Sequence, residues 1–155
     1  MLNEYIVYWL EEPFTRRYFK KSDILFRFLK QYEKDKERQD LLLQFKYITK
    51  IFPKDVIIEL FNDYRYKHKI NVHVDSQKKI DIRKENNIIT LWINTNRIVF
   101  YCSSLDVAEF VLLPILREFH PYLFIANMET NEYGWISPIF SSDQFKKEQV
   151  LYSIK

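Results

Sequence analysis

Apolar positions change their spacing several times along this chain. Residues 5–10 are aliphatic or aromatic on both alternating faces, which predicts a strand that is covered on both sides or central in a sheet. Pro13 fits the first turn of a helix, because its missing N–H has no intrahelical partner there, and Phe14 and Tyr18 lie four residues apart on one helical face. The pattern therefore predicts a strand followed by a short helix over residues 13–19.

Helical spacing then continues through the next part of the chain. The apolar residues between 24 and 32 repeat with helical spacing, and Ser22 is placed to cap the start of this second helix. Residues 30–40 are densely charged with both signs, which is typical of a solvated helix end and its connection.

A third helix is predicted between residues 39 and 52, and it carries two apolar stripes. One stripe consists of Leu41, Phe45, Ile48 and Phe52. The second stripe, on another side, consists of Leu43, Gln44, Tyr47 and Ile51. A helix with two such faces needs two partners. Pro53 is expected to end it, and a further amphipathic helix follows over residues 56–64.

From residue 70 the apolar spacing changes to two, which predicts strands. Alternation covers residues 70–74 and 80–82, and residues 88–93 and 97–102 flank an Asn-Thr-Asn turn as a hairpin. The C-terminal strands are predicted over 122–127 and 133–136.

A last helix is predicted between the hairpin and these strands. Ser103 and Asp106 have the spacing of a capping box that opens a helix over about 105–119, which Pro114 bends or breaks. Together the elements predict a single α+β domain, a largely antiparallel sheet packed with four to five helices, whose N-terminal half is helix-rich after the first strand. We expect the domain to span residues 1–140 and residues 141–155 to form a frayed polar tail.

Composition limits the class of protein. The 155 residues are 47% hydrophobic, enough for one buried core. No apolar run approaches the roughly 20 residues of a membrane helix, and the N-terminus lacks the pattern of a secretory signal. Cys102 is the only cysteine, so one chain can build neither an internal disulfide nor a multi-cysteine zinc site. We expect a cytoplasmic protein without membrane association.

Candidate catalytic residues are few. Gly134 is the only glycine, which excludes glycine-rich phosphate loops, dinucleotide fingerprints and nucleophile elbows. His68 and His73 lie five apart, so on one strand they would point to opposite faces and could not share a metal ion. A hydrolase using Cys102 and His120 stays open, although the alternating position of the cysteine favours a small core residue. We expect no enzyme, no cofactor and no metal.

Two basic clusters contain aromatic residues, at 16–21 and 65–69. Such clusters serve either phosphate contacts with base stacking or a protein partner held by aromatic anchors. The formal net charge of only +3 favours the protein partner, and no direct contact with nucleic acid is expected. The alternative is a small nucleic-acid-binding protein that uses the cations Arg16, Arg17, Lys20 and Lys21.

Segments near both ends resemble a known family. They are YIVYWLEEPFTRRYF at 5–19, LFRFLKQY at 25–32, QFKYIT at 44–49, PYLF at 121–124 and EYGWISP at 132–138. In order and spacing they are similar to the sporulation inhibitor of replication (SirA) family, and Tyr-Gly-Trp followed by Pro is the most distinctive piece. The two stretches that these segments span, 5–49 and 121–138, make up about two fifths of the chain.

This resemblance implies a function. Family members are small proteins of endospore formers that bind the N-terminal domain (domain I) of the replication initiator DnaA and prevent new rounds of replication as sporulation begins, without cofactor or catalysis. Their contact residues fall on Phe14, Tyr18, Gln44 and Tyr47 here, and Pro138 falls in a C-terminal segment linked to activity.

From the residues themselves we add Arg17 as a rim charge. Core packing is the alternative role for each aromatic residue. The resemblance predicts a stoichiometric inhibitor, and we expect it to be a monomer before complex formation.

Overall fold

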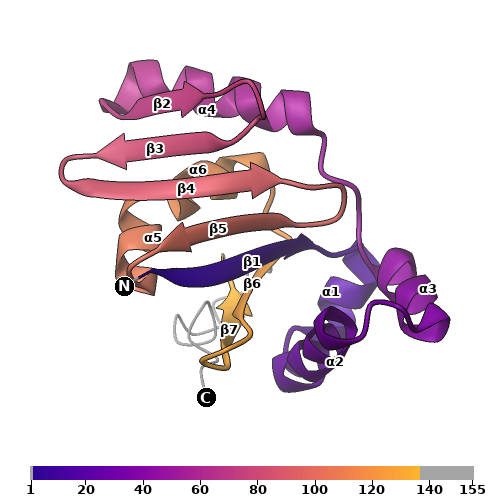
Figure 1. Cartoon of the computed structure of the whole chain (residues 1–155). Coiled ribbons are helices and arrows are strands. Elements are labelled where there is room, and N and C mark those ends of the chain that lie inside the picture. Colours follow the sequence, from indigo (N-terminus) through magenta and orange to yellow (C-terminus); the bar gives the residue numbers. More distant parts are fainter. Residues whose placement is uncertain (1, 137–155) are drawn as a thin grey trace.

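A computed structural model describes residues 2–136, which form a seven-stranded sheet with helices on both faces (Figure 1). The strands are β1 (Asn3–Trp9), β2 (Asn71–Val74), β3 (Ile80–Lys84), β4 (Asn87–Ile93), β5 (Ile98–Cys102), β6 (Leu123–Asn127) and β7 (Glu132–Trp135). Their order in the sheet is β2-β3-β4-β5-β1-β6-β7, and every neighbouring pair is antiparallel. The first strand of the chain therefore lies inside the sheet.

The helices among the described residues are α1 (Glu12–Tyr18), α2 (Ser22–Lys34), α3 (Gln39–Ile48), α4 (Lys54–His68), α5 (Leu105–Val111) and α6 (Leu113–Phe119). The predicted α+β class with its largely antiparallel sheet is confirmed. Six helices replace the expected four to five, partly because the helix predicted over 105–119 is broken at Leu112. Pro114 has no N–H to continue the helical hydrogen bonds across this point.

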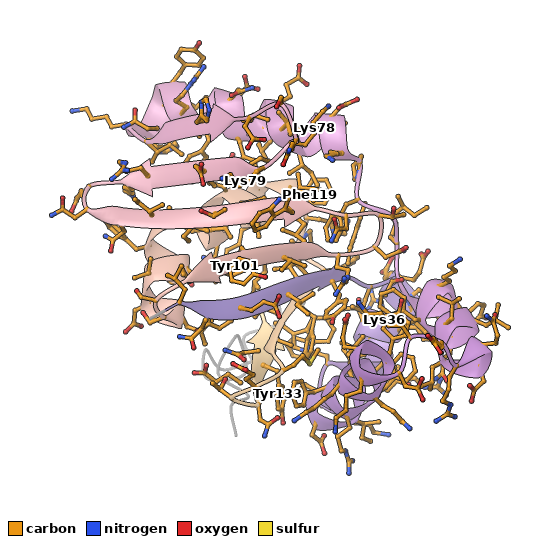
Figure 2. All side chains as sticks on the ribbon, in the orientation of Figure 1. Lys36, Lys78, Lys79, Tyr101, Phe119 and Tyr133 are labelled. Atoms are coloured by element: carbon orange, nitrogen blue, oxygen red, sulfur yellow. The ribbon has the colours of Figure 1, made fainter. Side chains whose placement is uncertain are left out.

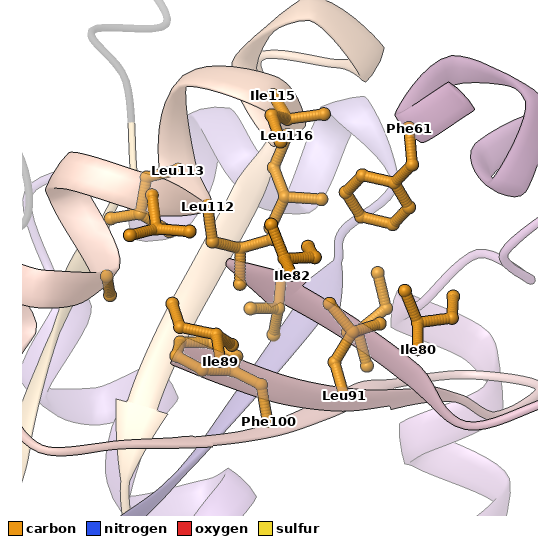
Figure 3. Close-up of a cluster of buried hydrophobic side chains, with 14 of the residues drawn as sticks. Phe61, Ile80, Ile82, Ile89, Leu91, Phe100, Leu112, Leu113, Ile115 and Leu116 are labelled. Carbon is orange, nitrogen blue, oxygen red and sulfur yellow. The ribbon is translucent and has the colours of Figure 1, made fainter. Parts of the chain in front are cut away.

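One face of the sheet is covered by α4, α5 and α6 (Figure 1). Figure 3 shows Phe61 of α4 and Leu116 of α6 directed at strand residues that include Ile82. We call this cluster the aliphatic core, because aromatic residues make up only 5 of its 25 buried members. Its centre is fully shielded from solvent, as the 0% exposure of Phe61 shows.

The opposite face is covered by α1, α2 and α3, which gather over the β1, β6 and β7 end of the sheet (Figure 1). We call this cluster the aromatic core, because 8 of its 16 buried members are aromatic. The stack of Phe26 on Tyr133 joins α2 to β7, with 4.6 Å between the ring centroids. Figure 2 shows Tyr133 at this end and Tyr101 on the half of the same face that these three helices leave uncovered.

Strand β1 separates the two cores. Val7 lies in the aliphatic core and Tyr8 in the aromatic core, and both side chains are 0% exposed. The prediction of a strand covered on both sides is confirmed.

The third helix ends earlier than predicted. It stops at Ile48, because Thr49 forms a β-bridge with Leu10 and the N–H of Lys50 donates to the carbonyl of Trp9 at 2.7 Å. A tertiary contact with β1, rather than Pro53, therefore ends α3.

Both predicted helix caps were wrong in detail. Ser22 is the first residue of α2, and Lys21 occupies the cap position without a side-chain hydrogen bond. At α5 the cap is Ser104 instead of Ser103, and its hydroxyl accepts a hydrogen bond from the N–H of Val107. Several polar residues stand near each helix start, so sequence alone does not select the one that occupies the cap position.

Candidate partner-binding surface

Helices α1 and α3 meet at two aromatic side chains. The rings of Phe14 and Tyr47 are 5.3 Å apart, centroid to centroid, in an edge-on arrangement of 69°. The N–H of Glu11 donates to the carbonyl of Ile48 at 2.9 Å, which ties the start of α1 to the end of α3. The structure thus brings together residues that are more than thirty positions apart in the sequence.

The predicted contact residues differ in exposure. Phe14 and Tyr18 are half-buried against the edge of the aromatic core, whereas Gln44 and Arg17 are exposed. Tyr47 is 72% exposed, although its ring contacts Phe14. Core packing therefore does not account for Tyr47, and it accounts for only part of the surface of the other two aromatic residues.

Buried contacts hold α3 in this orientation. Leu41, Phe45 and Ile48 point into the aromatic core, as their stripe predicts. The fourth member of that stripe, Phe52, was assigned wrongly, because it lies beyond the end of α3 and packs in the aliphatic core. Phe45 stacks on Tyr32 of α2 with ring centroids 4.1 Å apart and planes only 8° from parallel. Because this stripe faces inward, the second stripe of the same helix faces solvent, where Leu43 is 66% exposed.

An ionic group in the aromatic core was missed by the sequence reasoning. The carboxylate of Glu33 accepts hydrogen bonds from the Tyr8 hydroxyl at 2.8 Å and from Arg97 at 2.7 Å, and its side chain is only 11% exposed. Burial, followed by the neighbouring Glu33 charge, raises the pKa of Tyr8 well above its ordinary value.

The charged composition of residues 30–40 had predicted a solvated segment, and Glu33 is an exception to it. The available signal was its spacing, because Glu33 lies four residues after the fully buried Leu29 on the same face of α2.

The chain was compared with known families and proteins. The family described as sporulation inhibitor of replication protein SirA matches residues 3–140, which is most of the chain. The chain belongs to the SirA family. No curated protein matches it. The description of the SirA family is that of a regulatory inhibitor, which agrees with the resemblance carried by the terminal segments.

The SirA match includes all of the predicted contact residues. Phe14, Tyr18, Gln44, Tyr47 and Arg17 lie on the two adjacent helices described above. Pro138 also falls within the SirA match, but it lies outside the described residues, as does the predicted tail over 141–155.

The structure separates the two residues of the alternative hydrolase site. Cys102 pairs with Asn3 at one end of β1. The ring of His120 lies at the other end, where its centroid is 4.9 Å from that of Trp9. Six strand residues span roughly 20 Å, so the thiol and the imidazole cannot exchange a proton. Burial raises the pKa of Cys102 to about 11, which keeps the thiol protonated and unreactive at neutral pH.

The other histidines also do not form a site together. His68 ends α4 and stacks on Tyr64 at 3.9 Å, whereas His73 is exposed on β2. Within residues 2–136 no group of three potential metal-ligating side chains comes together, and no helix there is long and apolar enough to cross a membrane.

The two basic clusters lie on helices that cover opposite faces of the sheet. The cluster over 16–21 belongs to α1 and the turn after it, and the cluster over 65–69 belongs to the end of α4. Arg16 is engaged by Glu12 at 2.7 Å, and Arg65 lies over the ring of Tyr66. The clusters therefore do not combine into one continuous basic surface.

Proposed function

We propose that the chain is a stoichiometric inhibitor of replication initiation that binds the N-terminal domain of DnaA through α1 and α3. The main support is the Phe14–Tyr47 contact, in which a half-buried ring supports a tyrosine that is 72% exposed. A tyrosine held in place by a neighbouring ring loses little side-chain freedom on binding, which is a property of residues that dominate protein interfaces.

Each residue has a distinct role in the proposed complex. Phe14 and Tyr18 are the apolar anchors, because part of each side chain stays accessible above the aromatic core. Gln44 and Tyr47 orient the partner through their polar groups, and Arg17 lies at the rim. The chain is a monomer before it meets its partner, and one chain covers one initiator domain.

Inhibition follows from occupancy alone. The N-terminal domain of the initiator supports self-assembly and the recruitment of helper proteins at the origin, so a chain bound to it blocks these contacts. Since no bond is made or broken, the extent of inhibition follows the ratio of the two proteins and their affinity.

Calorimetric titration with the N-terminal domain of the host's DnaA tests this function. We expect saturable binding that Phe14→Ala, Tyr18→Ala and Tyr47→Ala each weaken by about 1 kcal/mol or more. Tyr66→Ala is the matched control. Tyr66 is 79% exposed on α4, so this substitution removes a similar ring from the helical layer on the opposite face of the sheet.

Folding of each variant is checked by circular dichroism and thermal unfolding. The proposal fails if the unaltered chain gives neither heat nor complex at about tens of micromolar, where a weak but specific interaction is still detectable. Equal losses in Tyr66→Ala and in the three surface variants would also contradict it, because the contact would then not lie on α1 and α3.

A further inference from the structure

The two helices of the proposed surface present the same kinds of side chain in the same order. On α1, Phe14 is followed three and four residues later by Arg17 and Tyr18. On α3, Leu43 is followed at the same spacing by Lys46 and Tyr47. Residues three and four apart lie on one helical face, so each helix presents an apolar residue, a cation and a tyrosine together.

The cations of these faces are not neutralised. Arg17 and Lys46 are exposed, and so is Lys21, which stands just beyond the end of α1. Within the part of the chain that the structure describes, none of the three forms an ion pair. We call these three residues the basic rim.

The carboxylates of the same helices are already bound. Glu12 is the acidic residue of α1 and pairs with Arg16 at 2.7 Å, while Asp40 is that of α3 and pairs with Arg38 at 2.6 Å. The carboxylates within α1 and α3 are therefore engaged by other cations, and the basic rim keeps its positive charge.

We infer that this surface takes a partner face with an apolar centre and an acidic border, and that the basic rim accelerates the encounter. This inference rests on the proposed function and adds the chemistry of the bound face. Charges at an exposed rim contribute little to affinity, but they raise association rates by attracting an oppositely charged partner. The exposed apolar residues Leu43 and Tyr47 supply the contacts that keep the complex together once formed.

The apolar centre also distinguishes a protein from a nucleic acid. Leu43 is 66% exposed beside the cations, and a phosphate backbone offers nothing to cover a leucine side chain. An acidic protein surface with its own apolar centre matches both features of the site. The observations therefore favour a protein partner.

Association and dissociation rates of the full chain with the N-terminal domain of DnaA test the inference. Between about 50 and 300 mM NaCl, the association rate should fall about tenfold. Arg17→Glu and Lys46→Glu should each slow association about threefold or more and change dissociation less than about twofold. Leu43→Ala should do the reverse, with dissociation about tenfold faster.

Lys67→Glu is the matched control, because it makes the same charge change at an exposed position of α4. We expect it to leave both rates unchanged. If the unaltered chain binds at a rate that does not depend on salt, and Arg17→Glu and Lys46→Glu leave that rate unchanged, this inference is overturned and the proposed function stands. Failure of the unaltered chain to bind would overturn the proposed function, and this inference with it.

A duplex DNA fragment serves as the competing probe. We expect no binding to it at about 150 mM salt. Tight binding that Arg17→Glu and Lys46→Glu abolish would assign the basic rim to nucleic acid and would overturn the inference of an acidic protein partner.

Discussion

The two helical layers of this protein are built from different kinds of contact. The layer of α4, α5 and α6 packs aliphatic side chains on the sheet, whereas the layer of α1, α2 and α3 is held by stacked rings and by the Glu33–Arg97 ion pair. Aliphatic packing is non-directional, but ring stacking and charge-assisted hydrogen bonds have preferred geometries. The layer that carries the proposed binding surface is thus the one whose contacts fix the orientation of its helices.

Truncation of one phenylalanine in each layer should have the largest effect. Phe61 and Phe45 are 0% and 2% exposed, and Phe61→Ala or Phe45→Ala should each lower the free energy of unfolding by about 3–5 kcal/mol. Chemical denaturation measures both losses.

The milder variants Phe61→Leu and Phe45→Leu, which retain more of the packing, then separate the layers in a binding assay. Only Phe45→Leu should lower the affinity for the partner, because Phe45 stacks on Tyr32 and so sets the orientation of α3. Equal affinities of the two leucine variants would show that the layers do not differ in this respect.

Removal of the cation from the aromatic core should have an intermediate effect. Arg97→Ala removes the closer of the two cations that pair with the 11% exposed carboxylate of Glu33 and leaves Lys36 at 3.1 Å, which should lower the free energy of unfolding by about 1.5 kcal/mol. Arg97→Lys should lose less, because it keeps the charge.

A double-mutant cycle with Glu33→Gln isolates the pair. Strictly additive losses would mean that the ion pair does not hold α2 against the turn before β5, and that the stacked rings alone position this layer.

Alkaline pH should destabilise the aromatic core through Tyr8 by a smaller, graded amount. Burial raises the pKa of Tyr8 well above its ordinary value of 10.0, so the folded chain keeps a proton that the unfolded chain releases. The resulting stability is complete below pH 10 and is lost as the pH rises toward the pKa of the folded state.

Urea unfolding at pH 9, 10 and 11 measures this loss. The slope contributed by one tyrosine approaches about 1.4 kcal/mol per pH unit, and Tyr8→Phe should remove that share. Tyr5 contributes in the same direction, because burial raises its pKa to about 12, so the variant retains part of the slope. Identical slopes in both chains would contradict the assignment to Tyr8.

Periodicity was sufficient to predict most of the elements of this fold. The change from helical to alternating spacing at residue 70 is set by local side-chain order, and α4 and β2 meet near this point. The interior position of β1 was also predictable, because Val7 and Tyr8 are both apolar and point to opposite faces. The type of each element and the interior position of β1 depend on which side chains are buried, and the spacing of apolar residues predicts this directly.

Features decided by tertiary contacts were not predictable in this way. The end of α3 depends on the bridge between Thr49 and Leu10, which lie far apart in the sequence. The burial of Glu33 depends on Arg97, sixty-four positions later. For the candidate surface, spacing alone placed Phe14 and Tyr18 on one face of α1, whereas the Phe14–Tyr47 contact appears only when α1 and α3 are packed together.

The position of β1 inside the sheet has a consequence for synthesis of the chain. Ile6 pairs with Val99 on one side and with Ala126 on the other, so β1 cannot pair until strands about ninety or more positions later have been made. Contacts of such high sequence separation form slowly, because a long loop must close before they can contribute. Helices α1 and α3 emerge early, but the sheet that supports them is complete only after β7 has left the ribosome. A chain that lacks β6 and β7 would therefore lack the rigid support of the proposed binding surface.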